Sequence, residues 1–271
     1  MPHRFFSNVP LVFAHRGGSA LAPENTRAAF DRGLALGADG LELDVHLSRD
    51  GVVVVHHDRE LDRTTNLHGK IADRTARELA RADAGYAFGP GEGYPYRGRA
   101  AGIPALGDVL SGYRDVPVIV ELKVNTAEMA EAVIAVVRAA GAVDRVCLAS
   151  FGRTVLRVAR AREPSIATSA AREEVRWALY RSWCRWPVTH VGYDAYQVPE
   201  WAGRTQVVSP RFVADAHRAG LGVQVWTVDT EADATRLLDW GVDGLITDRP
   251  DVIVPLVRAR RSASQVAPRS G

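Results

Sequence analysis

The stretch GADGLELDVHLSRDGVVVVHHD, residues 37–58, indicates the type of fold and also carries charges that its strand pattern does not need. Its apolar, β-branched runs Gly40–Leu47 and Val52–Asp58 predict two short strands joined by a turn. Residues two apart in a strand point to the same side, so Glu42 and Asp44 share one face. Two carboxylates on the inner face of a buried strand would repel each other and be poorly solvated. They therefore predict a counter-charge, which a divalent cation can supply.

Similar apolar runs alternate with helical patterns along the rest of the chain. The predicted strands are Leu11–His15, Gly40–Leu47, Val116–Lys123, Arg145–Phe151, Ser165–Ala170, His190–Ala195, Gly222–Val228 and Gly244–Asp248. The predicted helices are Glu24–Leu36, Pro104–Tyr113, Ala127–Ala140, Arg153–Arg162, Arg172–Arg181, Pro210–Ala219, Glu231–Trp240 and Asp251–Arg260. Eight such units predict an α/β protein whose parallel sheet closes into a (β/α)8 barrel, the TIM barrel fold. An open doubly wound sheet is the alternative, but no glycine-rich dinucleotide turn follows the first strand.

Two segments fall outside this alternation. Residues 59–102 are polar and rich in Gly, Pro and Tyr, so we expect a small insertion in a βα loop, over the face where barrel active sites lie. Residues 258–271 are rich in Ser and Arg, which predicts a flexible basic tail. Residues 1–257 are then one domain, close to the roughly 250 residues typical of such barrels.

The composition narrows the class of protein. With 46% hydrophobic and 24% charged residues and a formal net charge of +2, it is typical of soluble globular proteins. The charges are interspersed, and two cysteines are too few for a disulfide framework. No apolar run approaches the ~20 residues of a membrane span, and Ser7, Asn8 and Pro10 interrupt the apolar N-terminus. We expect a cytoplasmic protein without a nucleic-acid partner, and the sequence indicates no oligomeric state.

Reactive side chains recur at the ends of other predicted strands. The first strand ends at His15 and Arg16, the hairpin strand reaches His57, and a third ends with Glu121 and Lys123. Carboxylates suit hard cations such as Mg²⁺ or Ca²⁺, and arginine and lysine suit a phosphate. Two histidines suit a general acid and a general base. Together these residues predict metal-assisted hydrolysis of a phosphate ester.

Several motifs in a fixed order support this reading. AHRGGSALAPENTRAAF, GADGLELDVHLSRDGVVVVHHDRELDRTT, IPALGDVL, VIVELK, VWTVD and GVDGLITDRPD occur between Ala14 and Asp251. As a set they resemble the glycerophosphodiester phosphodiesterase family in order and spacing. The resemblance implies a (β/α)8 barrel with a small extra subdomain after the HD motif. It also implies hydrolysis of small-molecule glycerophosphodiesters, such as glycerophosphocholine or glycerophosphoethanolamine, to sn-glycerol 3-phosphate and an alcohol.

The resemblance further implies a role for each residue that fills a family motif. The implied site consists of an acid–base pair (His15 and His57), ligands for one divalent cation, Mg²⁺ or Ca²⁺ (Glu42, Asp44 and Glu121), and substrate-binding side chains (Arg16, Lys123 and Trp226). Arg16 and Lys123 would hold phosphate oxygens, and Trp226 would line the pocket for the glycerol or alcohol. Which histidine is the base, and whether water or a substrate hydroxyl attacks, both stay open.

Other residues near these motifs could support the site. Glu24 and Asn25 lie at a predicted helix start, where capping is one role and orienting the site is another. His56 lies on the strand face opposite His57, so we expect it to pack or to support the site from behind. For Asp58 and Asp248 we expect hydrogen bonding rather than reaction.

The segment VRWALYRSWCRW, residues 175–186, is both basic and aromatic. Its tryptophans could rest on a membrane surface, or a barrel helix could bury them. We expect the second arrangement, so membrane contact is possible but not favoured.

Two other functions remain as alternatives. Related barrels act on lysophospholipids in the manner of a phospholipase D, but those relatives are typically secreted and disulfide-bonded, unlike this chain. A barrel that only binds a phosphodiester would be marked by loss of a histidine or a cation ligand, and none is lost here.

Overall fold

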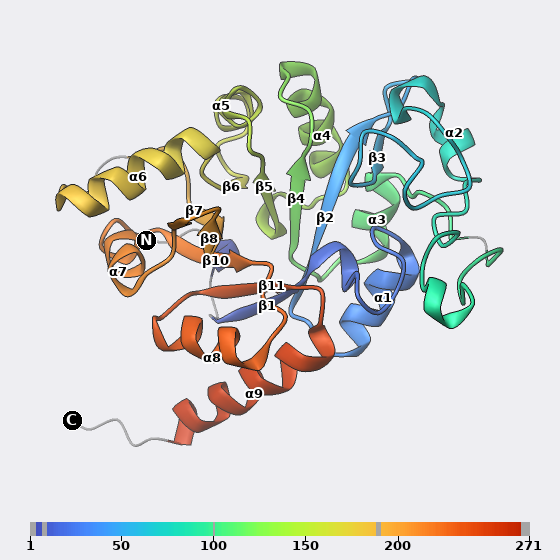
Figure 1. The fold of residues 1–271 in the computed structure, drawn as a ribbon. Coiled ribbons are helices and arrows are strands. Elements are labelled where there is room, and N and C mark those ends of the chain that lie inside the picture. The colour runs from blue at the N-terminus through green and yellow to red at the C-terminus, as the bar shows by residue number, and fades with distance from the viewer. Residues whose placement is uncertain (1–3, 7–9, 100, 188–190, 267–271) are drawn as a thin grey trace.

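Eight parallel strands form a nearly closed barrel in the computed structural model, which describes residues 4–6, 10–99, 101–187 and 191–266 (Figure 1). Around the barrel the order is β6, β5, β4, β2, β1, β11, β10 and β7. Their bounds are Leu11–Ala14 (β1), Gly40–Leu47 (β2), Val118–Leu122 (β4), Val146–Ala149 (β5), Ala167–Thr168 (β6), Ala195–Pro199 (β7), Gly222–Trp226 (β10) and Gly244–Thr247 (β11). An isolated bridge between Ser169, next to β6, and Ala195 of β7 completes the ring. The prediction of a (β/α)8 barrel is confirmed.

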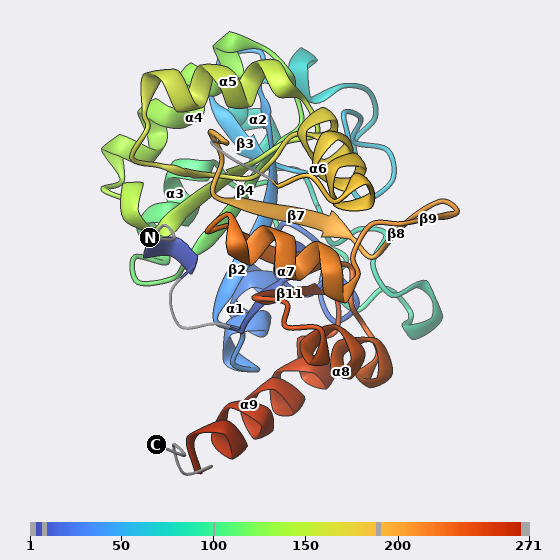
Figure 2. The ribbon, with the colours of Figure 1, turned by 90° about the vertical axis from the view of Figure 1, so that its left-hand side faces the viewer.

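Helices surround the barrel on its outside (Figures 1 and 2). Their bounds are Arg27–Ala35 (α1), Ala76–Leu79 (α2), Leu106–Gly112 (α3), Ala127–Ala139 (α4), Arg153–Arg162 (α5), Arg172–Cys184 (α6), Pro210–Arg218 (α7), Glu231–Asp239 (α8) and Pro250–Val266 (α9). In α4, Thr126 caps the first turn, while Met129, Val133 and Val137 recur at the helical spacing and are buried. Among the described residues, no helix is both long enough and apolar enough to cross a membrane.

Inside the barrel, an apolar layer lies beneath a layer of polar side chains. Phe13 of β1, Ile119 of β4 and Ile246 of β11 belong to one buried apolar cluster. Glu121 comes two residues after Ile119 in β4, and so on the same face, and His15 directly follows the end of β1. The strands therefore fill the barrel with apolar groups at one end and present polar groups at their C-terminal ends, where active sites of this fold lie.

The sixth predicted strand differs from the strand in the structure. A strand over His190–Ala195 is wrong, since β7 covers Ala195–Pro199, and His190 itself lies outside the described residues. The side-chain amide of Gln197 in β7 donates to the side chain of Gln224 in β10 at 2.7 Å. A polar inward residue and a proline at the strand end both weaken the apolar pattern by which strands are predicted.

The insertion after the hairpin has a small apolar core of its own. Strand β3 (Val53–Val55) pairs antiparallel with β2, as the predicted hairpin requires. Residues 59–102 follow it and precede α3. Leu61, Ile71 and Leu79 from this segment are buried together. A short hairpin, β8 (Trp201–Ala202) with β9 (Thr205–Gln206), projects beyond the end of β7 on the side where α6 lies (Figure 2).

The predicted start of a flexible tail at Arg258 is wrong, because α9 continues to Val266. The guanidinium of Arg261 donates to the carbonyl oxygen of Pro10 and pairs with the carboxylate of Asp39. These partners are distant in sequence, so composition alone could not reveal them.

Candidate active site

Two histidines at the polar end of the barrel are each held by a carboxylate. Nδ1 of His15 lies 2.6 Å from Oδ1 of Asp248, and Nδ1 of His57 lies 2.6 Å from Oδ1 of Asp58. A carboxylate only accepts hydrogen bonds, so each Nδ1 carries a proton and each Nε2 is the atom left for chemistry. The expectation that both aspartates form hydrogen bonds agrees with this geometry.

The environment of His15 favours its charged form. Burial lowers the pKa of His15, but the carboxylates of Glu42 and Asp248 outweigh burial and raise the pKa overall. Nε2 of His15 lies 3.8 Å from Oε2 of Glu42. His15 is therefore next to the group of carboxylates as well as to its own aspartate.

The turn after His15 depends on glycine. Arg16 has a φ of 50° and Gly17 a φ of 88°, both in the left-handed region. A Cβ on Gly17 would lie 2.7 Å from Ala29 of α1, too close for any side chain. In this turn the backbone N–H of Arg16 donates to Oε2 of Glu42 at 3.0 Å. The HRG motif thus fixes β1 and the carboxylates in one arrangement.

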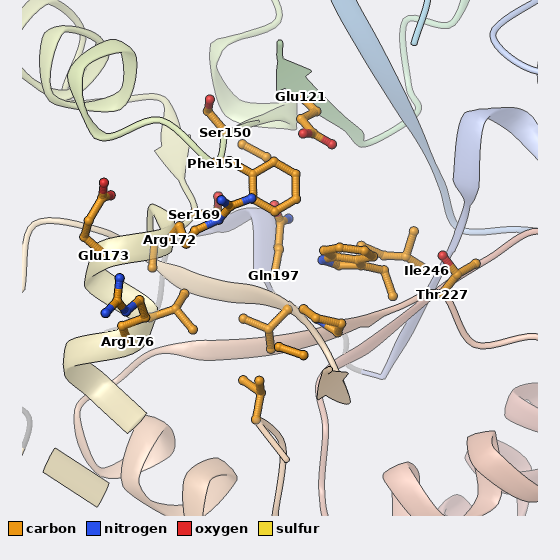
Figure 3. A pocket seen from close by; sticks show the side chains of 18 of the residues that line it. Glu121, Ser150, Phe151, Ser169, Arg172, Glu173, Arg176, Gln197, Thr227 and Ile246 are labelled. Atoms are coloured by element: carbon orange, nitrogen blue, oxygen red, sulfur yellow. The ribbon is translucent and has the colours of Figure 1, made fainter. Parts of the chain in front are cut away.

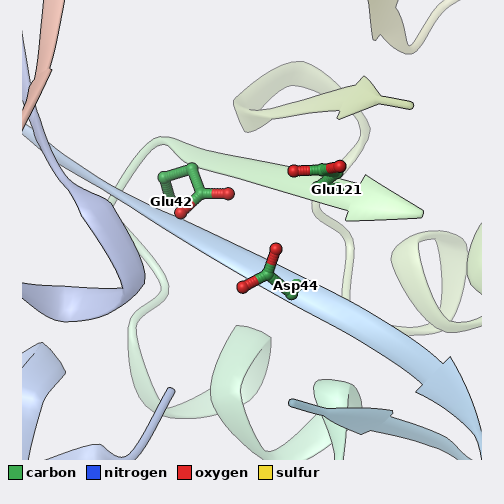
Figure 4. A group of neighbouring side chains, drawn as sticks. All are labelled: Glu42, Asp44 and Glu121. Carbon is green, nitrogen blue, oxygen red and sulfur yellow. The ribbon is translucent and has the colours of Figure 1, made fainter. Parts of the chain in front are cut away.

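Three carboxylates, Glu42 and Asp44 of β2 and Glu121 of β4, converge at this end of the barrel (Figure 4). Asp44 and Glu121 are direct neighbours in the parallel pairing of the two strands. One oxygen from each of the three lies within 4.8 Å of the others. Oδ1 of Asp44 and Oε1 of Glu121 are buried oxygens, and both face the ammonium of Lys123. Oxygen donors in this arrangement fit a hard divalent cation.

The charges within this group affect one another. Burial, followed by the charges of Asp44 and Glu121, raises the pKa of Glu42 to about 7. Burial alone would also raise the pKa of Asp44, but Lys123 and Arg16 outweigh it and lower that pKa. Nζ of Lys123 lies 2.8 Å from Oδ1 of Asp44 and 3.1 Å from Oε1 of Glu121. Three carboxylates thus face two cationic side chains, which leaves room for a further positive charge.

The predicted supporting residues contact the site, though not through helix capping. Thr26 caps α1, so a capping role for Glu24 or Asn25 is wrong. Asn25 instead donates to Oδ2 of Asp44 at 2.8 Å and accepts from the backbone N–H of Asp44 at 3.2 Å. Glu24 accepts from Arg16 at 3.0 Å. His56 is buried, with its Nε2 3.3 Å from the carbonyl oxygen of Glu60.

Two further residues belong to this network. The guanidinium of Arg63, in the insertion, bonds the carboxylates of both Asp58 and Glu24, and so links the two sides of the site. Nε2 of His46 lies 3.0 Å from the carbonyl oxygen of His57. The sequence signal for Arg63 is its place in LDRTT, at the end of the long motif quoted above. The signal for His46 is that it shares a strand face with Glu42 and Asp44.

A cavity of about 1300 Å³ opens at the polar end of the barrel (Figure 3). The predicted site residues that line it are His15, Arg16, Glu42, His57, Glu121, Lys123 and Trp226. The ring of Trp226 meets that of Phe151 edge to face, with centroids 6.0 Å apart. Glu173 and Arg176 of α6 lie at the left of this view, and the guanidinium of Arg172 lies over the ring of Phe151.

The expectation that the tryptophans of residues 175–186 are buried is wrong. Trp177 is 66% exposed, and Trp183 and Trp186 are each 62% exposed. The face of α6 that packs inward consists of Ala178, Leu179 and Ser182. The tryptophans occupy other positions along the chain, and so their rings lie outside this inward face.

Fold and geometry together define a (β/α)8-barrel hydrolase with its reactive groups at the C-terminal ends of the strands. Residues 15–252 match the model of the glycerophosphoryl diester phosphodiesterase family. The match spans most of the 271 residues, so the chain belongs to this family and is an enzyme, a phosphodiesterase.

Individual relatives agree with this assignment. A glycerophosphodiester phosphodiesterase of Caldanaerobacter subterraneus subsp. tengcongensis is 36% identical over 255 residues, covering 92% of this chain and 98% of the relative. The crystal structure of the glycerophosphoryl diester phosphodiesterase domain of an uncharacterized Mycobacterium tuberculosis protein has a TM-score of 0.81 and 25% identity, covering 93% and 100%. A phosphodiesterase of Oleispira antarctica, solved in complex with the product sn-glycerol-3-phosphate, has a TM-score of 0.74 and 27% identity, covering 94% and 99%.

Proposed function

We propose that this enzyme hydrolyses glycerophosphodiesters, such as glycerophosphocholine and glycerophosphoethanolamine, to sn-glycerol 3-phosphate and an alcohol. The observation that carries the proposal is the convergence of two carboxylate-held histidines with three carboxylates, of which Glu42 and Glu121 line the same cavity as the histidines. The Oleispira antarctica relative, solved with sn-glycerol-3-phosphate as its product, supports the same substrate class.

One divalent cation, Mg²⁺ or Ca²⁺, would be held by Glu42, Asp44 and Glu121. Bound there, it would polarise phosphoryl oxygens and offset their charge. Asn25 fixes the orientation of the Asp44 carboxylate through two hydrogen bonds, and the turn at Arg16 fixes that of Glu42. The protein thus orients its oxygen donors before any ligand binds.

Arg16 and Lys123 are the cationic side chains proposed for the phosphate. Both line the cavity, and both lie among the carboxylates rather than in open solvent. A guanidinium and an ammonium so placed bind phosphate oxygens and stabilise the charge that builds up on them during hydrolysis. Their ion pairs with Asp44 hold them in this position between turnovers.

His15 and His57 would transfer the protons. One removes a proton from the nucleophile and the other protonates the leaving alkoxide, each through Nε2. Asp248 and Asp58 keep the proton on Nδ1 and stabilise the charged imidazole when it forms. The His15–Asp248 and His57–Asp58 pairs have the same geometry. Either histidine can therefore be the acid and the other the base.

A direct test follows the release of glycerol 3-phosphate from glycerophosphocholine with Mg²⁺, with Ca²⁺ and with EDTA. We expect release that EDTA abolishes and that one of the two ions restores. Folded protein that releases no glycerol 3-phosphate with either ion would contradict the proposed substrate class. Full release in EDTA would contradict the role of the carboxylates as cation ligands.

A further inference from the structure

Arg63 belongs to the insertion, yet its guanidinium contacts two carboxylates of the active site. Its Nε donates to Asp58, and its two terminal nitrogens donate to Glu24. Arg63 is not among the described residues that line the cavity, and its side chain is 48% exposed. Any influence of Arg63 on the reaction must therefore pass through the two carboxylates that it contacts.

The core of the insertion fixes the backbone from which this side chain extends. Leu61, two residues before Arg63, is buried together with Ile71 and Leu79. Thr65, two residues after Arg63, is also buried, and its hydroxyl donates to the carbonyl oxygen of Leu61 at 2.9 Å. These contacts close a turn with Arg63 at its centre, so the insertion presents the guanidinium to the barrel from a fixed position.

The first contact of Arg63 leads to the proton-transfer groups. Oδ1 of Asp58 lies 2.6 Å from Nδ1 of His57, and Oδ2 of the same carboxylate accepts from Arg63. One partner on each oxygen fixes the plane of the carboxylate. Burial raises the pKa of Asp58, but the hydrogen bonds from Arg63 and His57 outweigh it and lower the pKa to about 2. Arg63 thus keeps Asp58 charged and oriented toward the imidazole.

The second contact leads to the side chain proposed for the phosphate. Oε1 and Oε2 of Glu24 accept from Arg63 at 2.7 and 2.8 Å, and Oε1 also accepts from Arg16 at 3.0 Å. Two guanidinium groups share this carboxylate, so the three groups carry one net positive charge. Without Arg63, the charge of Glu24 would neutralise that of Arg16 and weaken its attraction for a phosphate.

We propose that Arg63 is a positioning residue for the reaction, which orients His57 through Asp58 and keeps the charge of Arg16 available to the phosphate through Glu24. The inference deepens the function proposed above and rests on it. It gives the insertion a role in the chemistry, because the insertion carries the guanidinium that joins the proton-transfer side of the site to the phosphate side.

The test begins with Arg63→Met, which removes the charge but keeps a side chain of similar shape. In glycerophosphocholine hydrolysis we expect kcat to fall by about 10–100-fold, because a charged hydrogen bond behind His57 is lost. We expect KM to rise by about three- to fivefold, because Arg16 is then neutralised. Titration calorimetry should show the same three- to fivefold weakening for the product, glycerol 3-phosphate, in a measurement that does not depend on turnover.

Double variants separate the two contacts. In an Asp58→Asn background, adding Arg63→Met should lower kcat much less than it does in the unaltered enzyme, because the path to His57 is already broken. In a Glu24→Gln background, adding Arg63→Met should raise KM much less. Effects that simply add in both backgrounds would show that Arg63 does not act through these carboxylates and would overturn the proposal.

Two further variants guard against a loss of folding. Arg49→Met is the matched control, since Arg49 is 58% exposed and pairs with Glu78 of the insertion without contacting the site. We expect its kcat and KM to be unchanged. Arg63→Lys keeps the charge but cannot hold both carboxylates with one ammonium, so it should lose part of kcat and keep KM. Tm of each variant shows whether the protein is folded at the assay temperature.

Each outcome decides a different point. Values of kcat and KM within twofold of the unaltered enzyme in both Arg63 variants overturn the positioning role and leave the proposed function intact. An equal loss in Arg49→Met assigns the effect to anchoring of the insertion and also overturns the positioning role. Absence of glycerol 3-phosphate release from the unaltered enzyme contradicts the proposed function itself, and the positioning role falls with it.

Discussion

The two ends of the cavity are built from different parts of the fold and have different chemistry. At the inner end, side chains from the C-terminal ends of β1, β2 and β4 form a dense network of ion pairs. At the outer end, α6 presents tryptophans that are more than half exposed. Strand register fixes groups precisely enough for chemistry, whereas a helix beside the barrel can vary and bind parts of a substrate that do not react.

The largest effect should come from removing a histidine at the inner end. His15→Ala and His57→Ala should each lower kcat/KM for glycerophosphocholine by about 10²–10⁴, because each removes a proposed proton-transfer group. His68→Ala serves as a control, since His68 is an exposed histidine that also pairs with an aspartate, Asp62. A bell-shaped pH–rate profile that loses one limb in each histidine variant supports the pair, and near-normal activity in either contradicts it.

A smaller effect should follow from loss of the carboxylate behind a histidine. Asp248→Asn keeps the size of the side chain but removes the charge that helps to raise the pKa of His15. We expect a loss of about 10–100-fold in kcat/KM. The limb of the pH–rate profile that reports His15 should move to lower pH. A fall in rate with both limbs unmoved would show that Asp248 acts only through packing.

The pH dependence of the protein's stability should reveal the negative charge that Glu42, Asp44 and Glu121 bring together. The pKa of Glu42 is raised to about 7 in the folded protein from an ordinary value of 4.5. The folded state therefore binds a proton that the unfolded state has lost, so the metal-free protein loses stability as pH rises through this interval. A divalent cation offsets the negative charge, so it should raise Tm by a few degrees more at about pH 8 than at about pH 5. Glu42→Gln should reduce that difference, and an equal gain in Tm at both pH values in the unaltered protein would argue against cation binding here.

The smallest effect should occur where the two ends of the cavity meet. Trp226 is partly buried and lines the inner end, whereas Phe151, which its ring contacts, is 45% exposed. We expect Trp226→Ala to raise KM for glycerophosphocholine by about tenfold and Phe151→Ala by no more than about threefold, in proportion to the apolar area each can bury. Steady-state kinetics of the two variants measure this, and a reversed order would place the substrate nearer α6 than proposed.

Sequence alone could predict the inner end because strand geometry is regular. Residues two apart share a face, which places Glu42 beside Asp44 and puts Glu121 above the apolar Ile119. The parallel pairing of β2 with β4 then brings Asp44 next to Glu121. An eightfold alternation of strands and helices is sufficient for the barrel, and the barrel places strand ends together.

The outer end could not be predicted in the same way. A helical pattern shows which residues share a face but not which neighbouring element covers that face, so the exposure of Trp177 and Trp183 was missed. The contacts of Arg63 depend on how the insertion folds back over the site, and no spacing encodes that. Strand β7 was predicted at the wrong residues for another reason. Its inward-facing Gln197 is polar and forms a hydrogen bond with Gln224, so the segment lacks the apolar pattern by which strands are predicted.

The central claim is that the carboxylates of β2 and β4 hold a cation on which hydrolysis depends. The most direct measurement removes divalent cations with EDTA, returns Mg²⁺ or Ca²⁺ stepwise, and follows bound cation and glycerol 3-phosphate release on the same sample. The account predicts that activity rises with occupancy of one cation site per chain, and that Asp44→Asn and Glu121→Gln lower both together. Full activity before any cation binds, or unchanged cation binding in both variants, would contradict it.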